Sequence, residues 1–195
     1  MILILAGASA SGKSTCAKMI NDDNRNDIKQ VITYTTRKPR ENEQDCVDYH
    51  FVTDEQFNRM KDNNEFFEFV TYKNWQYGTK IDMNPMLNQV VVLNPTGVRA
   101  FKKYNEYYHT DMVIVYLNVD RRSRLIKMLE RGDDIEEAYR RCTSDEGQFA
   151  GFEREVNYVI ENDRYELSPE EVVSLIYNHA LNGETHNMEV SNESN

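Results

Sequence analysis

The segment Gly7–Thr15, which reads GASASGKST, constrains the fold of this chain more than any other feature. It matches the pattern G-x-x-x-x-G-K-[ST] without a mismatch, through Gly7, Gly12, Lys13 and Ser14. In such a loop the glycines let the backbone curl so that its N–H groups point at phosphate oxygens. The lysine reaches the β- and γ-phosphates, and the serine hydroxyl binds Mg²⁺. The motif therefore predicts a site for a nucleoside triphosphate and Mg²⁺, between a buried strand and a helix.

Short apolar runs predict the strands of the fold. Ile2–Ala6 ends directly at the loop, and a continuous apolar run of this length is typical of a strand buried on both faces. Two similar runs and two weaker ones give the remaining candidates, which are Val90–Leu93, Met112–Leu117, Val31–Tyr34 and Tyr158–Ile160.

Helical segments separate these runs. Ser168–Glu171 is a clear helix start, because serine caps, proline suits the first position and glutamate at the third completes a capping box. Further helices are expected over Lys13–Asn21, over Val98–Tyr107 and, from the cap Asp120, to about Glu130. Strands that alternate with helices predict an α/β fold of the P-loop NTPase type, with three layers and a parallel central sheet.

Two stretches interrupt this alternation. Thr33–Asp82 is rich in aromatic residues, threonine and charge, and predicts an inserted β-rich unit with one helix capped at Thr53. Arg121–Phe149 is charged and helical and predicts a mobile lid. We therefore expect a core of residues 1–32, 83–120 and 150–181, an insertion of 33–82 and a lid of 121–149. The polar tail 182–195 is expected to be disordered.

Composition narrows the partners and the compartment. The formal net charge is −10, which argues against non-specific binding of nucleic acid or an anionic membrane. The three cysteines, Cys16, Cys46 and Cys142, show no CxxC spacing and indicate free thiols in a reducing compartment. With no signal peptide or membrane-length apolar segment in the sequence, we expect a cytoplasmic protein. A monomer and a homodimer both remain open.

A basic cluster follows the loop on this acidic chain. Arg37 and Arg40 flank a proline, and Tyr49 and Tyr77 come later. The planar fork of arginine binds phosphate with two hydrogen bonds, so these side chains predict an anion clamp. The alternative on these residues alone is a solvated basic turn beside two core tyrosines.

The order and spacing of the motifs resemble the guanylate kinase family. The resemblance covers about residues 1–181, and the TTRxPR and DYxFV elements are specific to that family. The matching segments occur in the family's order as GASASGKST, TYTTRKPRENEQDCVDYHFV, EFFEF, QYGTK, LERG, EEAYRRC and VIENDR.

The resemblance implies a role for each matching residue. ATP with Mg²⁺ would be the phosphoryl donor and GMP or dGMP the acceptor, with Ser14 as the metal ligand. Lys13, Arg37, Arg131 and Arg141 would be catalytic. The donor would lie against Gly7, Ala8, Ser9, Ala10, Ser11, Gly12, Lys13, Ser14, Thr15 and Asn162. The acceptor would lie against Thr33, Arg37, Arg40, Tyr49, Glu68, Tyr77, Thr79 and Asn94, where Glu68 would accept the paired N–H groups of guanine.

The segment Val91–Gly97 departs from the family pattern. Val92 and Asn94 stand where the family has two aspartates, one near the metal and one that helps to read the guanine amino group. Two alternatives to a guanylate kinase therefore stay open. One is a related kinase with a broader or different acceptor, such as another deoxynucleotide or a ribose bisphosphate. The other is a non-catalytic module that binds phosphopeptides through the clamp.

Overall fold

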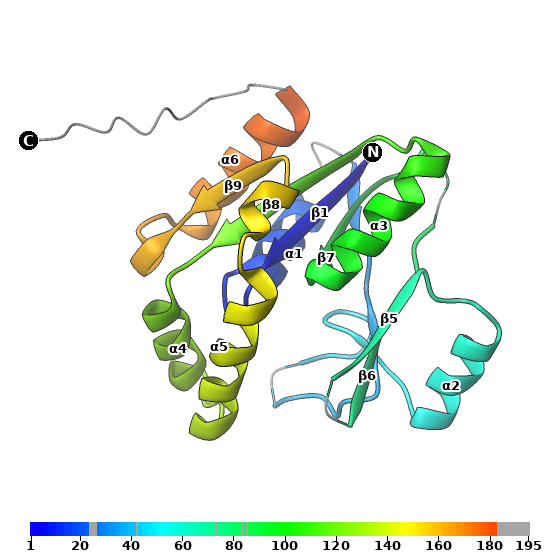
Figure 1. The fold of residues 1–195 in the computed structure, drawn as a ribbon, viewed down its shortest axis with the longest axis horizontal. Coiled ribbons are helices and arrows are strands. Elements are labelled where there is room, and N and C mark those ends of the chain that lie inside the picture. The colour runs from blue at the N-terminus through cyan, green and yellow to red at the C-terminus, as the bar shows by residue number, and fades with distance from the viewer. Residues whose placement is uncertain (24–26, 42, 73, 83, 85, 183–195) are drawn as a thin grey trace, which may run out of the picture.

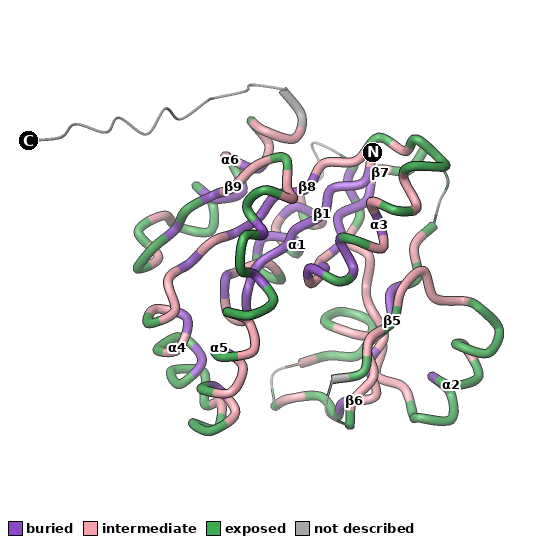
Figure 2. Tube along the Cα trace, in the orientation of Figure 1, coloured by how far each residue is buried: buried purple, intermediate pink, exposed green. Residues whose placement is uncertain are grey.

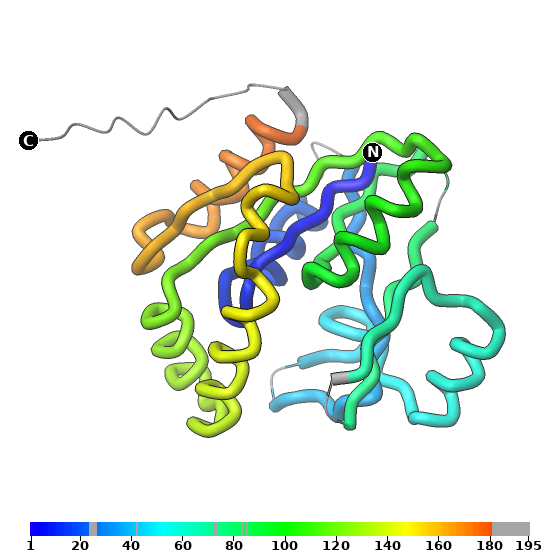
Figure 3. Tube along the Cα trace, viewed as in Figure 1, coloured from blue at the N-terminus to red at the C-terminus, as the bar shows by residue number. Residues whose placement is uncertain are grey.

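A computed structural model describes residues 1–23, 27–41, 43–72, 74–82, 84 and 86–182. Its central sheet has five parallel strands in the order β2-β7-β1-β8-β9. Leu3 pairs with Val90 of one neighbouring strand and Val113 of the other, so β1 runs through the middle of the sheet (Figure 3). The strands in chain order are β1 (Ile2–Gly7), β2 (Ile28–Gln30), β7 (Asn88–Leu93), β8 (Met112–Asn118) and β9 (Tyr158–Glu161).

Helices cover both faces of this sheet. Leu3 and Leu5 face one apolar cluster with residues of α1 (Lys13–Asp22) and α6 (Pro169–Asn182). Ile2 and Ile4 face a second cluster with residues of α3 (Pro95–Tyr108). Alternate side chains of one strand thus enter opposite layers, and Figure 2 shows the buried positions gathered on the central strands. The predicted three-layer α/β fold is confirmed.

Most predicted elements are present, with two corrections. The predicted strand Val31–Tyr34 is wrong, because β2 ends at Gln30 and a separate strand β3 (Tyr34–Thr35) belongs to another sheet. This apolar run is the crossing between two sheets. The helix predicted over Val98–Tyr107 begins earlier, at Pro95, because the Asn94 side chain accepts a hydrogen bond from the Gly97 N–H at 2.8 Å and caps it.

The insertion forms a second sheet, at the lower right of Figure 1. Its strands lie in the order β4-β3-β6-β5. Thr53 begins the helix of this unit with a capping box, in which its side chain and that of Gln56 each accept from the other's backbone N–H. The remaining elements are β4 (His50–Phe51), α2 (Asp54–Asp62), β5 (Glu68–Tyr72) and β6 (Trp75–Thr79).

Two helices, α4 (Arg121–Glu130) and α5 (Ile135–Phe149), form the segment expected to be a lid. Asp120 and Asp134 cap them through their side chains. Figure 1 places these helices and the insertion on either side of the end of β1 where the P-loop begins. Two short 3₁₀ turns, η1 (Phe152–Glu155) and η2 (Asp163–Tyr165), flank β9.

The expected disordered tail lies outside the described residues, apart from Asn182 at the end of α6. Within the described part of the chain, no helix is both long and apolar enough to span a membrane.

Candidate active site

The P-loop joins β1 to α1, and two glycines make its curve possible. A Cβ atom at Gly7 would lie 2.7 Å from the Leu117 carbonyl oxygen of the adjacent strand, so a larger residue does not fit there. Gly12 has a φ of 94°, a left-handed conformation that side chains disfavour, and it directly precedes the helix. The loop backbone therefore turns tightly enough to present its N–H groups at the N-terminus of α1.

Lys13 points into this curve. Its ammonium group donates to the Ala8 carbonyl at 2.7 Å and to the Ser11 hydroxyl at 3.3 Å. Burial lowers the pKa of Lys13 to about 8, and Asp145 is the strongest influence in the opposite direction. Ser14, the next residue of α1, is exposed. Its hydroxyl is accessible to Mg²⁺, which keeps several waters and takes few protein ligands, so this residue fits a metal bound with a triphosphate.

A cavity of about 440 Å³ lies on the α1 side of the loop. Asn162 lines it, but both halves of its side-chain amide bind the backbone of Leu167, at 3.2 and 2.8 Å. Asn162 thus fixes the turn that forms one wall. Tyr165, in the same wall, donates its hydroxyl hydrogen to the Ala10 carbonyl of the loop at 2.8 Å. The other expected donor-side residues lining this cavity are Ala10, Ser11, Gly12, Lys13, Ser14 and Thr15. Arg131, expected to be catalytic, lines it as well.

A second cavity, of about 460 Å³, lies between the P-loop, the insertion and α5. Lys13 lines both cavities, so the two lie next to each other at this residue. Gly7, Ser9 and Arg141 also line the second cavity, whereas Ala8 lines neither and offers its carbonyl to Lys13. This cavity brings together every residue expected to bind the acceptor, namely Thr33, Arg37, Arg40, Tyr49, Glu68, Tyr77, Thr79 and Asn94. Both volumes suit a nucleotide-sized ligand.

Arg37 is held in place from two directions. Its guanidinium donates to both carboxylate oxygens of Glu43, at 2.8 and 2.9 Å, and to the Lys38 carbonyl at 2.8 Å. It also lies 5.4 Å from the centre of the Tyr49 ring, a cation–π contact. Burial opposes the charge of Arg37, but the hydrogen bonds to Glu43 raise its pKa. The result is a guanidinium that is pre-oriented beside the acceptor cavity.

Arg40 and the lid arginines form a cationic cluster across this cavity. Burial, followed by the nearby charges of Arg141 and Arg37, lowers the pKa of Arg40. Asp133 partly offsets this repulsion, since it accepts from Arg131 Nε at 3.0 Å and lies 3.9 Å from Arg40 Nε. Such a cluster favours a ligand that carries several negative charges, as a phosphate does.

Glu68 contributes a half-buried carboxylate to the lining of the acceptor cavity. Its Oε1 accepts a 2.6 Å hydrogen bond from the Thr79 hydroxyl. Burial raises the pKa of Glu68, although the hydrogen bond from Thr79 works against this. Asn94 lines the same cavity, and its amide oxygen already caps α3 through the Gly97 N–H. The Nδ2 donor and the second lone pair of this oxygen are the parts of the Asn94 side chain that a ligand could meet.

The sequence pattern of guanylate kinase matches residues 1–179, which is nearly the whole described chain. The chain belongs to the guanylate kinase family. Membership in this family identifies it as an ATP-dependent phosphotransferase, and it confirms the resemblance seen in the sequence motifs.

Known guanylate kinases are similar over almost their whole length. The relative from Campylobacter jejuni is 27% identical over 191 residues, covering 96% of this chain and 93% of the relative. The relative from Rickettsia bellii is 30% identical over 182 residues, covering 90% and 93%. The crystal structure of guanylate kinase from Anaplasma phagocytophilum matches with a TM-score of 0.67 at 20% identity, covering 96% and 87%. The similarity to this crystal structure supports the fold.

This guanylate kinase family member departs from the family pattern inside the acceptor cavity. Val92 and Asn94 both line it, at the end of β7 and just beyond. In place of the first aspartate of the family pattern, the side chain of Val92 has no oxygen that could bind a metal ion or its waters. Asp145, from α5, lines the same cavity and accepts a 2.7 Å hydrogen bond from the Ser9 N–H of the P-loop.

The sequence motifs did not indicate the carboxylates that hold the cationic side chains. Glu43 holds Arg37, Asp133 holds Arg131, and Asp145 pairs with Arg124 at 3.4 Å. Glu137 plays the same part for Arg141, whose Nε donates to it at 2.9 Å. The signal for Glu43 and Asp133 was their closeness in sequence to a motif arginine. Asp145 gave no such signal, because it lies far from Ser9 along the chain.

Proposed function

We propose that this chain transfers the γ-phosphoryl group of ATP to GMP or dGMP and forms GDP or dGDP. The observation that carries the proposal is the meeting of two cavities at Lys13, one on the P-loop side and one lined by Arg37, Arg40, Tyr49 and Tyr77. A donor triphosphate on the loop and an acceptor monophosphate in the clamp would then face each other across Lys13.

The reaction needs alignment and charge neutralisation and no general base. The second pKa of a phosphate monoester is about 6, so the acceptor is already an oxyanion at neutral pH. Lys13 would lie against the β- and γ-phosphates, while Arg37 and Arg40 fix the acceptor. Bound at Ser14, Mg²⁺ would neutralise charge on the donor phosphates. Arg131 and Arg141 would approach the transferred group from the lid.

Water is a competing acceptor, so closure of the site matters. Asp133, in the segment proposed as the lid, accepts from Arg131 and lies 3.9 Å from Arg40 of the insertion, which supports a closing role for this segment. Asp145 makes a second connection, from α5 to the P-loop. We infer that the lid helices complete the site over the bound substrates and exclude water from the transferred group.

Glu68 is the residue proposed to select guanine. A carboxylate accepts from the N1–H and N2–H groups of guanine, and adenine offers no such pair of donors. Thr79 orients Glu68 through their 2.6 Å hydrogen bond. With its oxygen engaged at the Gly97 N–H, Asn94 offers a donor where an aspartate would offer a second acceptor. This observation supports a second candidate, a kinase with a broader acceptor range.

A phosphotransfer assay across all ribo- and deoxynucleoside monophosphates tests both candidates. We expect GMP and dGMP to give the highest kcat/KM, and comparable turnover of other monophosphates would favour the broader enzyme. A Lys13→Ala variant should lose activity with every acceptor, whereas Arg37→Ala should mainly raise the KM of the acceptor. ATP turnover that no monophosphate stimulates would overturn both candidates and favour a phosphopeptide-binding module.

A further inference from the structure

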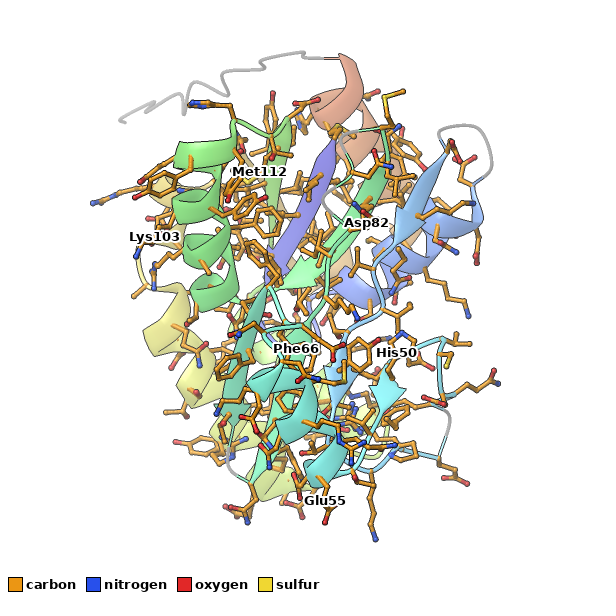
Figure 4. All side chains as sticks on the ribbon, turned by 90° about the vertical axis from the view of Figure 1, so that its right-hand side faces the viewer. His50, Glu55, Phe66, Asp82, Lys103 and Met112 are labelled. Atoms are coloured by element: carbon orange, nitrogen blue, oxygen red, sulfur yellow. The ribbon has the colours of Figure 1, made fainter. Side chains whose placement is uncertain are left out.

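A turn in the insertion, just before β4, gathers three side chains that the phosphotransfer reaction does not use. They are Asp45, Cys46 and His50, and one potential ligand atom of each lies within 4.8 Å of the other two. Asp45 and Cys46 are exposed and His50 is half-buried, so a solvent ion can reach them. Figure 4 shows His50 in the insertion, below the strands of the core.

The donor types identify the class of cation. A thiol, an imidazole and a carboxylate supply sulfur, nitrogen and oxygen, the combination used by Zn²⁺ and similar transition metals. Mg²⁺ and Ca²⁺ prefer oxygen ligands alone, so this cluster differs in chemistry from the Ser14 position. A tetrahedral zinc site separates its ligand atoms by roughly 3 to 4 Å. Small side-chain rotations would therefore complete the coordination.

The backbone of the turn already holds the ligands near one another. Asp45 Oδ1 accepts from the Phe51 N–H at 3.0 Å, and Asp45 Oδ2 lies 3.5 Å from Cys46 Sγ. The Cys46 N–H donates to the Tyr49 carbonyl at 2.9 Å, and Cys46 has a φ of 62°. A non-glycine residue in this left-handed region costs energy and is found often at functional sites.

His50 is fixed from the other side. The backbone N–H of His50 donates to the Thr33 carbonyl at 2.8 Å, and the centre of the imidazole ring lies 4.5 Å from that of the Tyr34 ring. Asp45 is exposed, so its carboxylate is open to a cation from the solvent.

We propose that Asp45, Cys46 and His50 bind Zn²⁺ or a transition metal of the same class, with water as the fourth ligand. Binding replaces the S–H bond of Cys46 by a sulfur–metal bond and releases the proton to solvent. Because the thiol must lose its proton to bind, metal affinity should increase as the pH rises.

A metal bound here would stabilise the turn that carries Tyr49 of the acceptor clamp. This role rests on the proposed function. Tyr49 lies between the ligands in sequence, and its ring packs against the guanidinium of Arg37. A metal that joins residues 45 and 46 to residue 50 would close the turn that carries Tyr49. Metal binding itself does not depend on phosphotransfer, so the two ideas can fail separately.

Cobalt binding to the full chain, without nucleotide or Mg²⁺, tests the site. We expect one Co²⁺ per chain, a sulfur-to-cobalt charge-transfer band and the visible bands of tetrahedral coordination, all displaced by Zn²⁺. Cys46→Ser should abolish the charge-transfer band. His50→Gln and Asp45→Asn should each lower the affinity for Co²⁺ by at least roughly 10-fold. Even the loss of a residue that only hydrogen-bonds to a metal ligand has an effect of that size. Asp48→Asn, a carboxylate change in the same turn, is the matched control and should bind normally.

Alkylation of the unaltered chain gives an independent measurement. Cys46 is exposed while Cys16 and Cys142 are buried, so iodoacetamide should label Cys46 first. Zn²⁺ should slow this labelling and Mg²⁺ should not. A cobalt spectrum without the sulfur band, or equal labelling with and without Zn²⁺, would overturn the site whatever the kinase assay shows.

Discussion

The carboxylate of Asp145, on helix α5, accepts a 2.7 Å hydrogen bond from the backbone N–H of Ser9 in the P-loop. The same carboxylate pairs with Arg124 of α4 at 3.4 Å, and both side chains are largely buried. Asp145 thus joins the two helices of the lid segment to the loop, and places a negative charge near Lys13. The protonation of Lys13 should therefore depend on Asp145.

The first prediction concerns the variant Asp145→Asn. In the free protein the pKa of Lys13 is about 8, because burial outweighs the opposite effect of Asp145. Arg124 and Arg131 lower it further, whereas Cys16 raises it. Lys13 thus carries its charge below pH 8 and loses it as the pH rises, so ATP binding should weaken through that range. Removing the Asp145 charge should move this transition to lower pH.

Calorimetric titration of ATP over a range of pH measures the transition directly. Glu146→Gln is the matched control, since Glu146 is an exposed neighbour that pairs with Arg121. It should leave the transition where it is. A transition that stays in place, or rises, in Asp145→Asn would contradict the assigned role.

The second prediction concerns Glu43, which orients Arg37 by two hydrogen bonds and accepts a third from the Arg40 N–H at 2.8 Å. In Glu43→Gln these contacts lose their charge and one acceptor oxygen. The acceptor KM should rise by roughly 10- to 100-fold, the size expected for a hydrogen bond to a charged group, while the KM for ATP stays near its original value. Steady-state kinetics with each substrate varied in turn provide the measurement.

The neighbouring carboxylate Glu41 provides the control for this experiment. It is exposed, and Glu41→Gln should change neither KM. Equal losses for donor and acceptor in Glu43→Gln would indicate general unfolding of the insertion, and the proposed positioning role would then be wrong.

The third prediction concerns the pH dependence of acceptor binding. Burial raises the pKa of Glu68, so its carboxyl takes up a proton at a higher pH than an exposed glutamate does. The protonated group cannot accept both guanine N–H donors, and the KM for GMP should rise as the pH falls through this raised pKa. Glu68→Gln should raise the KM at neutral pH and remove the acidic limb, whereas Glu65→Gln, at a half-buried carboxylate that pairs with Lys80, should keep it. An acidic limb that persists in Glu68→Gln would assign it to another group.

The sequence predicted the core of the fold because each strand carried its own local signal. β1 is apolar throughout and ends at a glycine, and the helix after Ser168 begins with its cap and proline. The prediction of one strand over Val31–Tyr34 was wrong, because the structure of this run depends on which strands its residues pair with. Its first residue bonds to Val90 of the core, while Thr33 accepts from His50 of the insertion. Hydrophobicity alone does not distinguish such a crossing from one strand.

The site shows the same division between local and distant information. Motifs predicted which arginines, tyrosines and carboxylate would gather, and the structure places them along one cavity. The contact between Asp145 and Ser9 joins residues that are 136 positions apart, and only the packing of α5 against the loop brings it about. The sequence also placed Asn94 against the acceptor, but it did not indicate that the Asn94 oxygen accepts from the Gly97 N–H and caps α3.

The last prediction tests whether Asn94 sets the acceptor range. In Asn94→Asp one carboxylate oxygen can keep the hydrogen bond from the Gly97 N–H, and the second becomes an acceptor for the guanine amino group. Asparagine and aspartate cap helices about equally well, so thermal stability should hardly change. The kcat/KM for GMP should rise by roughly 10-fold, the size of one hydrogen bond to a charged group, relative to the other monophosphates. Asn94→Ser, which caps α3 but lacks both groups, is the control and should show no such gain. If Asn94→Asp left the ratio unchanged at equal stability, base selection would rest on Glu68 and its Thr79 partner alone.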